Sequence, residues 1–138
     1  MNIAQILKKA YQLYPDRSAI SVGMNTLYTY RLFYERVRYL ATSMREELYL
    51  QPGDRIAIAM PNHPEYLVIR YAAWYAGLSV VPINSKLHAL EISYMLEHSG
   101  STVCFVFKSF SGESFSGTSH SAIVSRVIDV GSDEYRAL

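Results

Sequence analysis

The beginning of the chain carries hydrophobic positions at two different spacings. Near the N-terminus apolar side chains recur every three or four positions, which predicts a helix that begins after Asn2 and ends at Pro15. Two short apolar runs, 19–22 and 27–29, flank a connection containing glycine and asparagine and predict a hairpin. A second helical pattern, capped at Thr29, follows the hairpin. Its apolar face is expected to contain Phe33, Val37, Leu40, Ala41, Met44 and Leu48.

The next part of the chain alternates between strand and helix patterns. Continuous apolar runs are typical of strands that are buried on both faces. The runs are 56–60, 79–82 and 102–107, and the helical patterns between them are 64–76 and 89–99. Each helix is followed by a glycine, Gly77 or Gly100, as in helices that end in a left-handed conformation. This order predicts an α/β fold with a parallel β-sheet and helices on both faces; a mixed sheet is the alternative.

Beyond residue 107 we expect a loop and one more strand. Serine and glycine dominate residues 108–121, which favours a flexible loop. Residues 122–138 would supply a last strand, near 127–130, and a tail. The expected organisation is therefore a helix-hairpin-helix lead-in (1–50), a βαβαβ core (51–107) and these two C-terminal segments.

The net charge of the chain and the lengths of its apolar runs bear on two classes of partner, nucleic acid and membrane. Thirteen lysines and arginines against twelve acidic residues give a formal charge of +1, without the basic cluster that binds a phosphate backbone. We therefore expect no nucleic-acid partner. Because no apolar run reaches the roughly 18–20 residues of a membrane-spanning helix, we also expect no membrane span and a cytoplasmic protein.

The chain has one cysteine and four histidines, and their positions predict neither a disulfide nor a metal site. Cys104 lies in an apolar run between Val103 and Phe105, where a thiol is usually an inert part of the core. The histidines lack metal-ligand spacing to this cysteine or to a pair of carboxylates.

Four short segments, each weak alone, form a specific series in their order and spacing. They are Leu27-Tyr28-Thr29-Tyr30, Pro52-Gly53-Asp54-Arg55, Met60-Pro61-Asn62-His63-Pro64-Glu65 and Ala76-Gly77-Leu78-Ser79-Val80-Val81-Pro82-Ile83-Asn84-Ser85-Lys86-Leu87. This series resembles the opening of AMP-forming acyl-CoA synthetases of the adenylate-forming ligase superfamily. The resemblance is strong over residues 1–107 and looser beyond them.

The resemblance implies that the chain is the N-terminal part of the large domain of such a ligase. The complete enzyme would activate a carboxylic acid as an acyl-adenylate and transfer the acyl group to CoA, using ATP and Mg²⁺. The family's phosphate loop, acidic ATP-binding segment and C-terminal lysine would all follow residue 138. We therefore expect no catalytic residue, no cofactor and no activity in this portion alone, and its partners would be the remainder of the ligase chain, the carboxylic acid and CoA.

Two alternatives stay open at this point. The chain could be a truncated, non-catalytic module with a scaffold or self-association role. It could also belong to an adenylation domain that loads a carrier protein instead of CoA.

Ligands of open parallel sheets bind beyond the carboxyl ends of the strands, which directs attention to four residues. Asn62 and Asn84 could donate hydrogen bonds to a ligand, although asparagine in such loops more often forms a turn with its own backbone. His63 could contact substrate or bond a loop carbonyl. Lys86 could meet a phosphate of CoA or of a nucleotide, as the resemblance implies, or be a solvated surface lysine.

We also expect the purified chain to be a homo-oligomer. Without the rest of a large domain, apolar surface around Trp74 and Tyr75 would be uncovered. Light scattering tests this expectation, and a monodisperse monomer at tens of micromolar would contradict it.

Overall fold

The computed structural model describes residues 2–108, 124 and 126–138. They fall into two compact units, which are described separately. The N-terminal unit contains residues 1–52 and 64–78, and the sheet unit contains residues 53–63 and 79–138. The predicted subdivision of the chain near residues 50 and 107 stays a prediction. Residues 109–123, which include nearly all of the serine-rich segment, lie outside the described residues.

The N-terminal unit has the predicted helix, hairpin and helix, followed by a further helix. Its elements are α1 (Ala4–Leu13), β1 (Ser18–Val22), β2 (Asn25–Thr29), α2 (Tyr30–Glu46) and α3 (Pro64–Tyr75). Asn2 Oδ1 accepts a hydrogen bond from the Ala4 N–H at 2.9 Å, and Thr29 Oγ1 accepts one from the Leu32 N–H at 3.3 Å. Side-chain oxygens therefore satisfy backbone donors near the starts of both helices; Thr29 caps α2 as predicted, whereas Ile3 and not Asn2 directly precedes α1.

The hairpin turn is shorter than its sequence suggests. Only Gly23 and Met24 separate β1 from β2, instead of the predicted four-residue connection. Gly23 has a φ of +59°, the left-handed conformation that glycine adopts without a steric penalty. Strand β2 therefore begins closer to the turn than the apolar run 27–29 indicates, whereas β1 ends at Val22, where the run 19–22 ends.

Helix α2 forms the centre of the N-terminal unit. Five of its six predicted core residues are buried, whereas Leu48 is only half-buried and lies beyond the helix end. The buried five are Phe33, Val37, Leu40, Ala41 and Met44. Aromatic rings extend this core: Tyr34 stacks on Tyr11 with centroids 4.8 Å apart and meets Tyr75 edge-on at 6.2 Å. Several of the chain's twelve tyrosines, among them Tyr11, Tyr34 and Tyr75, therefore pack against one another in this unit.

The predicted exposed aromatics of α3 are partly covered. Asn2 donates a hydrogen bond from its side-chain amide to the Trp74 carbonyl at 2.6 Å, and the Trp74 ring packs edge-on against Tyr71 at 5.2 Å. Trp74 is half-buried, and Tyr75 is 38% exposed. Formation of a homo-oligomer stays a prediction.

The sheet unit confirms the predicted parallel sheet. Its strands are β3 (Arg55–Ala59), β4 (Ser79–Pro82), β5 (Val103–Val106) and β6 (Arg126–Asp129), in the spatial order β4-β3-β5-β6. All three pairings are parallel. Ala57 lies opposite Val81 on one side and Cys104 on the other. Along the chain β3 continues through α3 into β4, as a parallel crossover requires.

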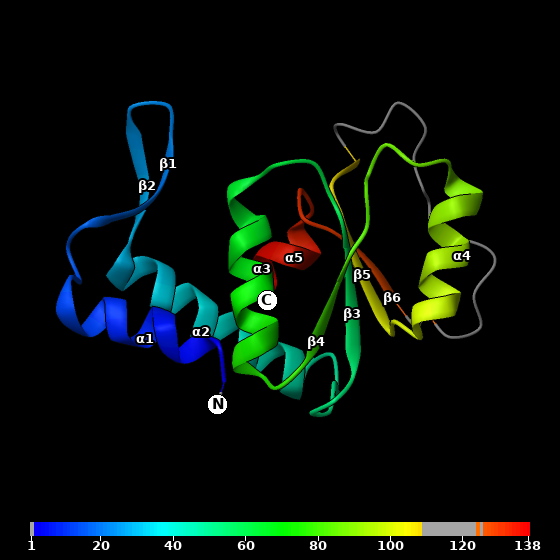
Figure 1. Cartoon of the computed structure of the whole chain (residues 1–138), viewed down its shortest axis with the longest axis horizontal. Coiled ribbons are helices and arrows are strands. Elements are labelled where there is room, and N and C mark those ends of the chain that lie inside the picture. The colour runs from blue at the N-terminus through cyan, green and yellow to red at the C-terminus, as the bar shows by residue number, and fades with distance from the viewer. Residues whose placement is uncertain (1, 109–123, 125) are drawn as a thin grey trace. The chain divides into compact units, whose positions relative to one another are not determined.

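Helices cover both faces of this sheet, as predicted. Helix α4 (Ala89–Ser99) packs Ile92 and Leu96 against a cluster that includes Ala57 and Cys104. The opposite face carries Phe105, whose ring lies 6.2 Å from that of Tyr135 in α5 (Asp133–Ala137). Figure 1 shows α4 and α5 on opposite sides of the strands. Because alternate residues point to opposite faces, every position of β5 is buried, which explains its unbroken apolar sequence.

The end of the chain differs from the expected strand and tail. Strand β6 begins one residue before the predicted 127–130 segment, and the tail contains the short helix α5. Ser132 Oγ accepts a hydrogen bond from the Tyr135 N–H at 3.2 Å and caps this helix. Among the described residues, no helix is both long enough and apolar enough to cross a membrane.

Candidate functional site

Parallel strands bring their carboxyl ends to one edge of the sheet, here called the carboxyl edge. Its residues follow β4 (Asn84, Lys86), β3 (Asn62, His63), β5 (Phe107, Lys108) and β6 (Asp129 at the strand end, Gly131). The strand order places the ends of β3 and β5 next to each other, with β4 and β6 outside them. In open α/β sheets this edge is where ligands bind, so it is the candidate site.

Asn84 makes a turn at the end of β4. Its Oδ1 accepts a hydrogen bond from the Lys86 N–H at 3.0 Å, and its backbone carbonyl accepts one from the Leu87 N–H at 3.2 Å. The turn-forming alternative for this asparagine is therefore present in the structure. The turn also fixes the backbone of Lys86, whose side chain is exposed.

His63 lies against an aromatic ring. Its ring centroid is 4.7 Å from that of Phe107, and the two ring planes are inclined by 44°. His63 is half-buried, whereas the neighbouring Asn62 is exposed. The structure thus joins the end of β3 to the end of β5 through His63. Ligand binding by Asn62, His63, Asn84 and Lys86 stays a prediction.

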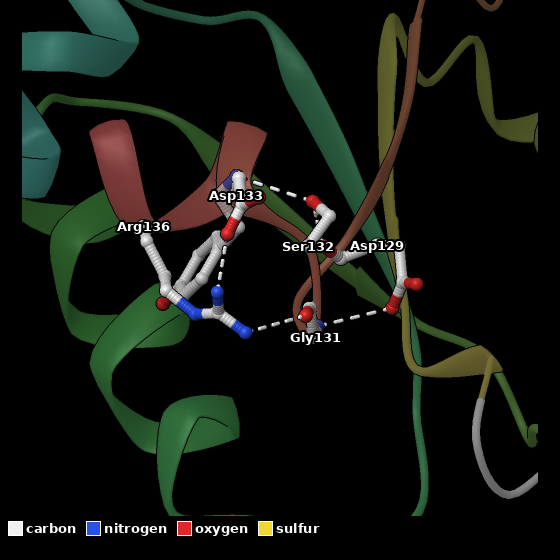
Figure 2. A network of polar contacts seen from close by, with 6 residues as sticks. Asp129, Gly131, Ser132, Asp133 and Arg136 are labelled. Atoms are coloured by element: carbon white, nitrogen blue, oxygen red, sulfur yellow. Dashed lines mark hydrogen bonds and ion pairs between the residues drawn. The ribbon is translucent and has the colours of Figure 1, made fainter.

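Two residues of the carboxyl edge were missed by the sequence analysis: Asp129 and Gly131. Asp129 Oδ1 accepts hydrogen bonds from the Gly131 N–H at 3.0 Å and from the Lys108 N–H at 3.3 Å. The first of these bonds is drawn in Figure 2. A signal was present in the sequence, because Asp129 interrupts the last apolar run, 127–130, and Gly131 directly follows that run.

The segment after β6 is held by a further set of polar contacts (Figure 2). The Asp129 carbonyl accepts hydrogen bonds from the Ser132 N–H at 3.0 Å and from Ser132 Oγ at 2.5 Å. Arg136 donates to the Gly131 carbonyl at 3.0 Å and pairs with Asp133. These bonds fix the connection between β6 and α5, and so the backbone that ends the sheet at this edge.

The described residues offer no ready set of ligands for the Mg²⁺ that the resemblance implies. Within residues 2–108, 124 and 126–138, no group of three or more histidine, cysteine, aspartate or glutamate side chains is placed to hold a metal ion. Asp129 Oδ1 is already bonded to two backbone N–H groups. No step of the chemistry is therefore assigned to a metal held by these residues.

Cys104 is part of the core, as predicted, and we expect it to be unreactive. Burial raises the pKa of its thiol to about 12 because the thiolate would be desolvated. A shift of this size from a reference near 9 lowers the thiolate fraction at pH 8 on the order of 1,000-fold. A thiol reagent at pH 8 should modify the native chain slowly and the guanidinium-unfolded chain at the rate of a free cysteine. Equal rates in both states would contradict the buried position.

Comparison with known proteins identifies the family. The family model "AMP-binding enzyme" matches residues 7–135. A long-chain-fatty-acid-CoA ligase of Haemophilus influenzae is 33% identical over 109 residues, which cover 79% of this chain and 19% of that protein. A probable peroxisomal acyl-activating enzyme of Arabidopsis thaliana is 33% identical over 104 residues, covering 75% of this chain and 18% of that protein.

A solved structure shows that the similarity to this family includes the fold. The N-terminal domain of FACL13 from Mycobacterium tuberculosis superimposes with a TM-score of 0.82 at 25% identity, covering 99% of this chain and 36% of that one. The chain spans about a fifth of the length of the curated relatives that it matches. Its motifs, its parallel sheet and the match over residues 7–135 agree, and the chain belongs to the family of AMP-binding enzymes, the adenylate-forming ligases.

Proposed function

We propose that this chain provides the N-terminal portion of an ATP-dependent acyl-CoA synthetase, which activates a carboxylic acid as acyl-AMP and converts it to acyl-CoA. The observation that carries the proposal is the family match over residues 7–135 on a parallel sheet whose strand ends lie at one edge. The ligase named for the Haemophilus relative supports the choice of a carboxylic acid and CoA as substrates.

In this proposal the carboxyl edge forms one wall of the acyl or CoA cavity. Lys86 supplies an exposed positive charge on a backbone fixed by the Asn84 turn, which suits a phosphate of CoA or of a nucleotide. His63 presents an imidazole beside an apolar ring. These groups would bind and orient substrate, and the charge-stabilising groups of the reaction would come from the remainder of the ligase. The 138 residues alone would therefore be inactive.

A chimeric enzyme tests this proposal. The 109-residue segment of the Haemophilus ligase that aligns with this chain would be replaced by the matching residues of this chain, and acyl-CoA formation would be measured. We expect the chimera to retain measurable activity, because the replaced segment supplies the same sheet and edge. The isolated chain, assayed at the same concentration, should form no acyl-CoA.

Lysine variants of the chimera test the role of the edge. Lys86→Ala should raise the KM for CoA or ATP about 10- to 150-fold, since a charge-assisted bond to phosphate contributes roughly 1.5–3 kcal/mol. Lys9→Ala, which removes an exposed lysine from α1, is the matched control and should leave both KM values unchanged. A chimera that folds and is inactive would contradict the ligase proposal and favour a non-catalytic module.

A further inference from the structure

One carboxylate oxygen connects two neighbouring strand ends of the sheet. Asp129 is the last residue of β6, and its Oδ1 accepts hydrogen bonds from the Lys108 N–H, which follows β5, and from the Gly131 N–H. Hydrogen bonds to an ionised acceptor are stronger than bonds between neutral groups. Asp129 therefore fixes the backbone beyond β5 and the backbone beyond β6 relative to each other.

Gly131 lies close to the ring of Phe107. A Cβ atom at position 131 would lie 3.3 Å from Phe107 Cε2 and 3.5 Å from Asp129 Oδ1. A carbon 3.3 Å from a ring atom is closer than the usual contact distance of 3.5–4.0 Å. A methyl group at position 131 would thus push the Phe107 ring away by a few tenths of an ångström.

The same ring is the contact surface of His63. Its centroid is 4.7 Å from the imidazole centroid, within the usual range for interacting rings. The order of contacts runs from Asp129 through Gly131 to Phe107 and then to His63. All four residues belong to the sheet unit, so this chain of contacts lies within one compact unit.

We propose that Asp129 is a positioning residue for His63: by holding Gly131 and the start of the segment after β5, it sets the Phe107 ring on which the imidazole rests. The importance of His63 for substrate rests on the proposed function, whereas the positioning itself does not. The hydrogen bonds that the Ser132 N–H and the Ser132 hydroxyl donate to the Asp129 carbonyl support the same arrangement, because they hold this residue through its backbone.

The positioning is tested by NMR on the isolated 138-residue chain without any ligand. In Asp129→Ala the amide protons of Lys108 and Gly131 should move upfield, because they lose an ionised acceptor, and the ring protons of His63 should shift as the Phe107 ring moves. Asp129→Asn keeps an oxygen at the Oδ1 position, so all three signals should return toward their wild-type values. The ring protons of His98, which stacks on Tyr94 in α4, should not move in any variant.

Two further variants separate positioning from a general loss of stability. Gly131→Ala should shift the His63 ring protons while the Lys108 amide proton stays near its wild-type position, because the added methyl group displaces Phe107 directly. Glu46→Gln, at an exposed carboxylate of α2 outside this network, should change neither signal. If Asp129→Ala folds and moves the two amides but leaves His63 unchanged, the proposal is wrong. If that variant does not fold, an unchanged His63 signal in Gly131→Ala overturns it.

This experiment is independent of the ligase assay. An active chimera with an unchanged His63 signal would leave the proposed function standing and remove the positioning role. An inactive chimera with the predicted NMR shifts would contradict the proposed function and leave the positioning role standing.

Discussion

Replacing Phe105 by alanine is expected to remove about 3–5 kcal/mol from the free energy of unfolding of the sheet unit. Phe105 is fully buried in β5, opposite Ile58 of β3 and Ile128 of β6, and its ring meets Tyr135 edge-on. The substitution leaves a cavity between the central strands and α5. Because typical domains are stable by only about 5–15 kcal/mol, this loss is a large fraction of the total stability.

Urea denaturation followed by circular dichroism measures this change. Leu90→Ala is the matched control, since Leu90 is 69% exposed on α4 and its truncation should alter the unfolding free energy by less than about 0.5 kcal/mol. If Phe105→Ala and Leu90→Ala were equally harmless, β5 would not be the buried centre of a sheet covered on both faces.

The second large effect is expected at a polar cluster of the N-terminal unit. The Tyr28 hydroxyl donates a hydrogen bond to Glu65 Oε1 at 2.5 Å, and Arg36 Nε lies 3.9 Å from Glu65 Oε2. This cluster ties the hairpin and α2 to the first turn of α3. Tyr28→Phe removes a hydrogen bond to a charged acceptor and should cost about 1.5–3 kcal/mol in unfolding free energy.

The same contact predicts a dependence on alkaline pH. Burial raises the pKa of Tyr28 to about 12, with a further contribution from the hydrogen bond to Glu65. The unfolded chain releases the phenolic proton near pH 10, before the folded chain does. The stabilisation by Tyr28 is therefore complete below about pH 10 and is lost as the pH rises toward 12.

Unfolding free energies of the wild type and of Tyr28→Phe, measured from pH 8 to pH 11.5, check this expectation. Their difference should shrink as the pH rises above about 10, whereas a difference that grows would contradict the assigned pKa. Tyr39→Phe is the control, because Tyr39 is 71% exposed on α2 and its replacement should give a small difference at every pH.

The fold was largely predictable because its signals are local. The unbroken apolar run of β5 and the glycine after each crossover helix are properties of short segments, and both matched the structure. Helix α5 was missed because five residues are too few to show a helical period. Its signal was the capping Ser132, followed by two acidic residues.

The contacts of the candidate site and of the polar cluster around Glu65 were less predictable because they join distant parts of the chain. The bond from Lys108 to Asp129 spans 21 residues, and the bond from Tyr28 to Glu65 spans 37. Each depends on the pairing of elements, which residue spacing does not reveal. The turn at Asn84 was foreseen because its bond to the Lys86 N–H spans only two residues.

The parallel pairing of β3 with β5 is the claim on which the carboxyl edge and the proposed function both depend. Cross-strand nuclear Overhauser effects between backbone protons measure it directly. The structure predicts that Ile56, Ala57 and Ile58 meet Val103, Cys104 and Phe105 in the same order. Contacts in the reverse order, with Ile56 near Phe105 and Ile58 near Val103, would show an antiparallel pair and would contradict the account.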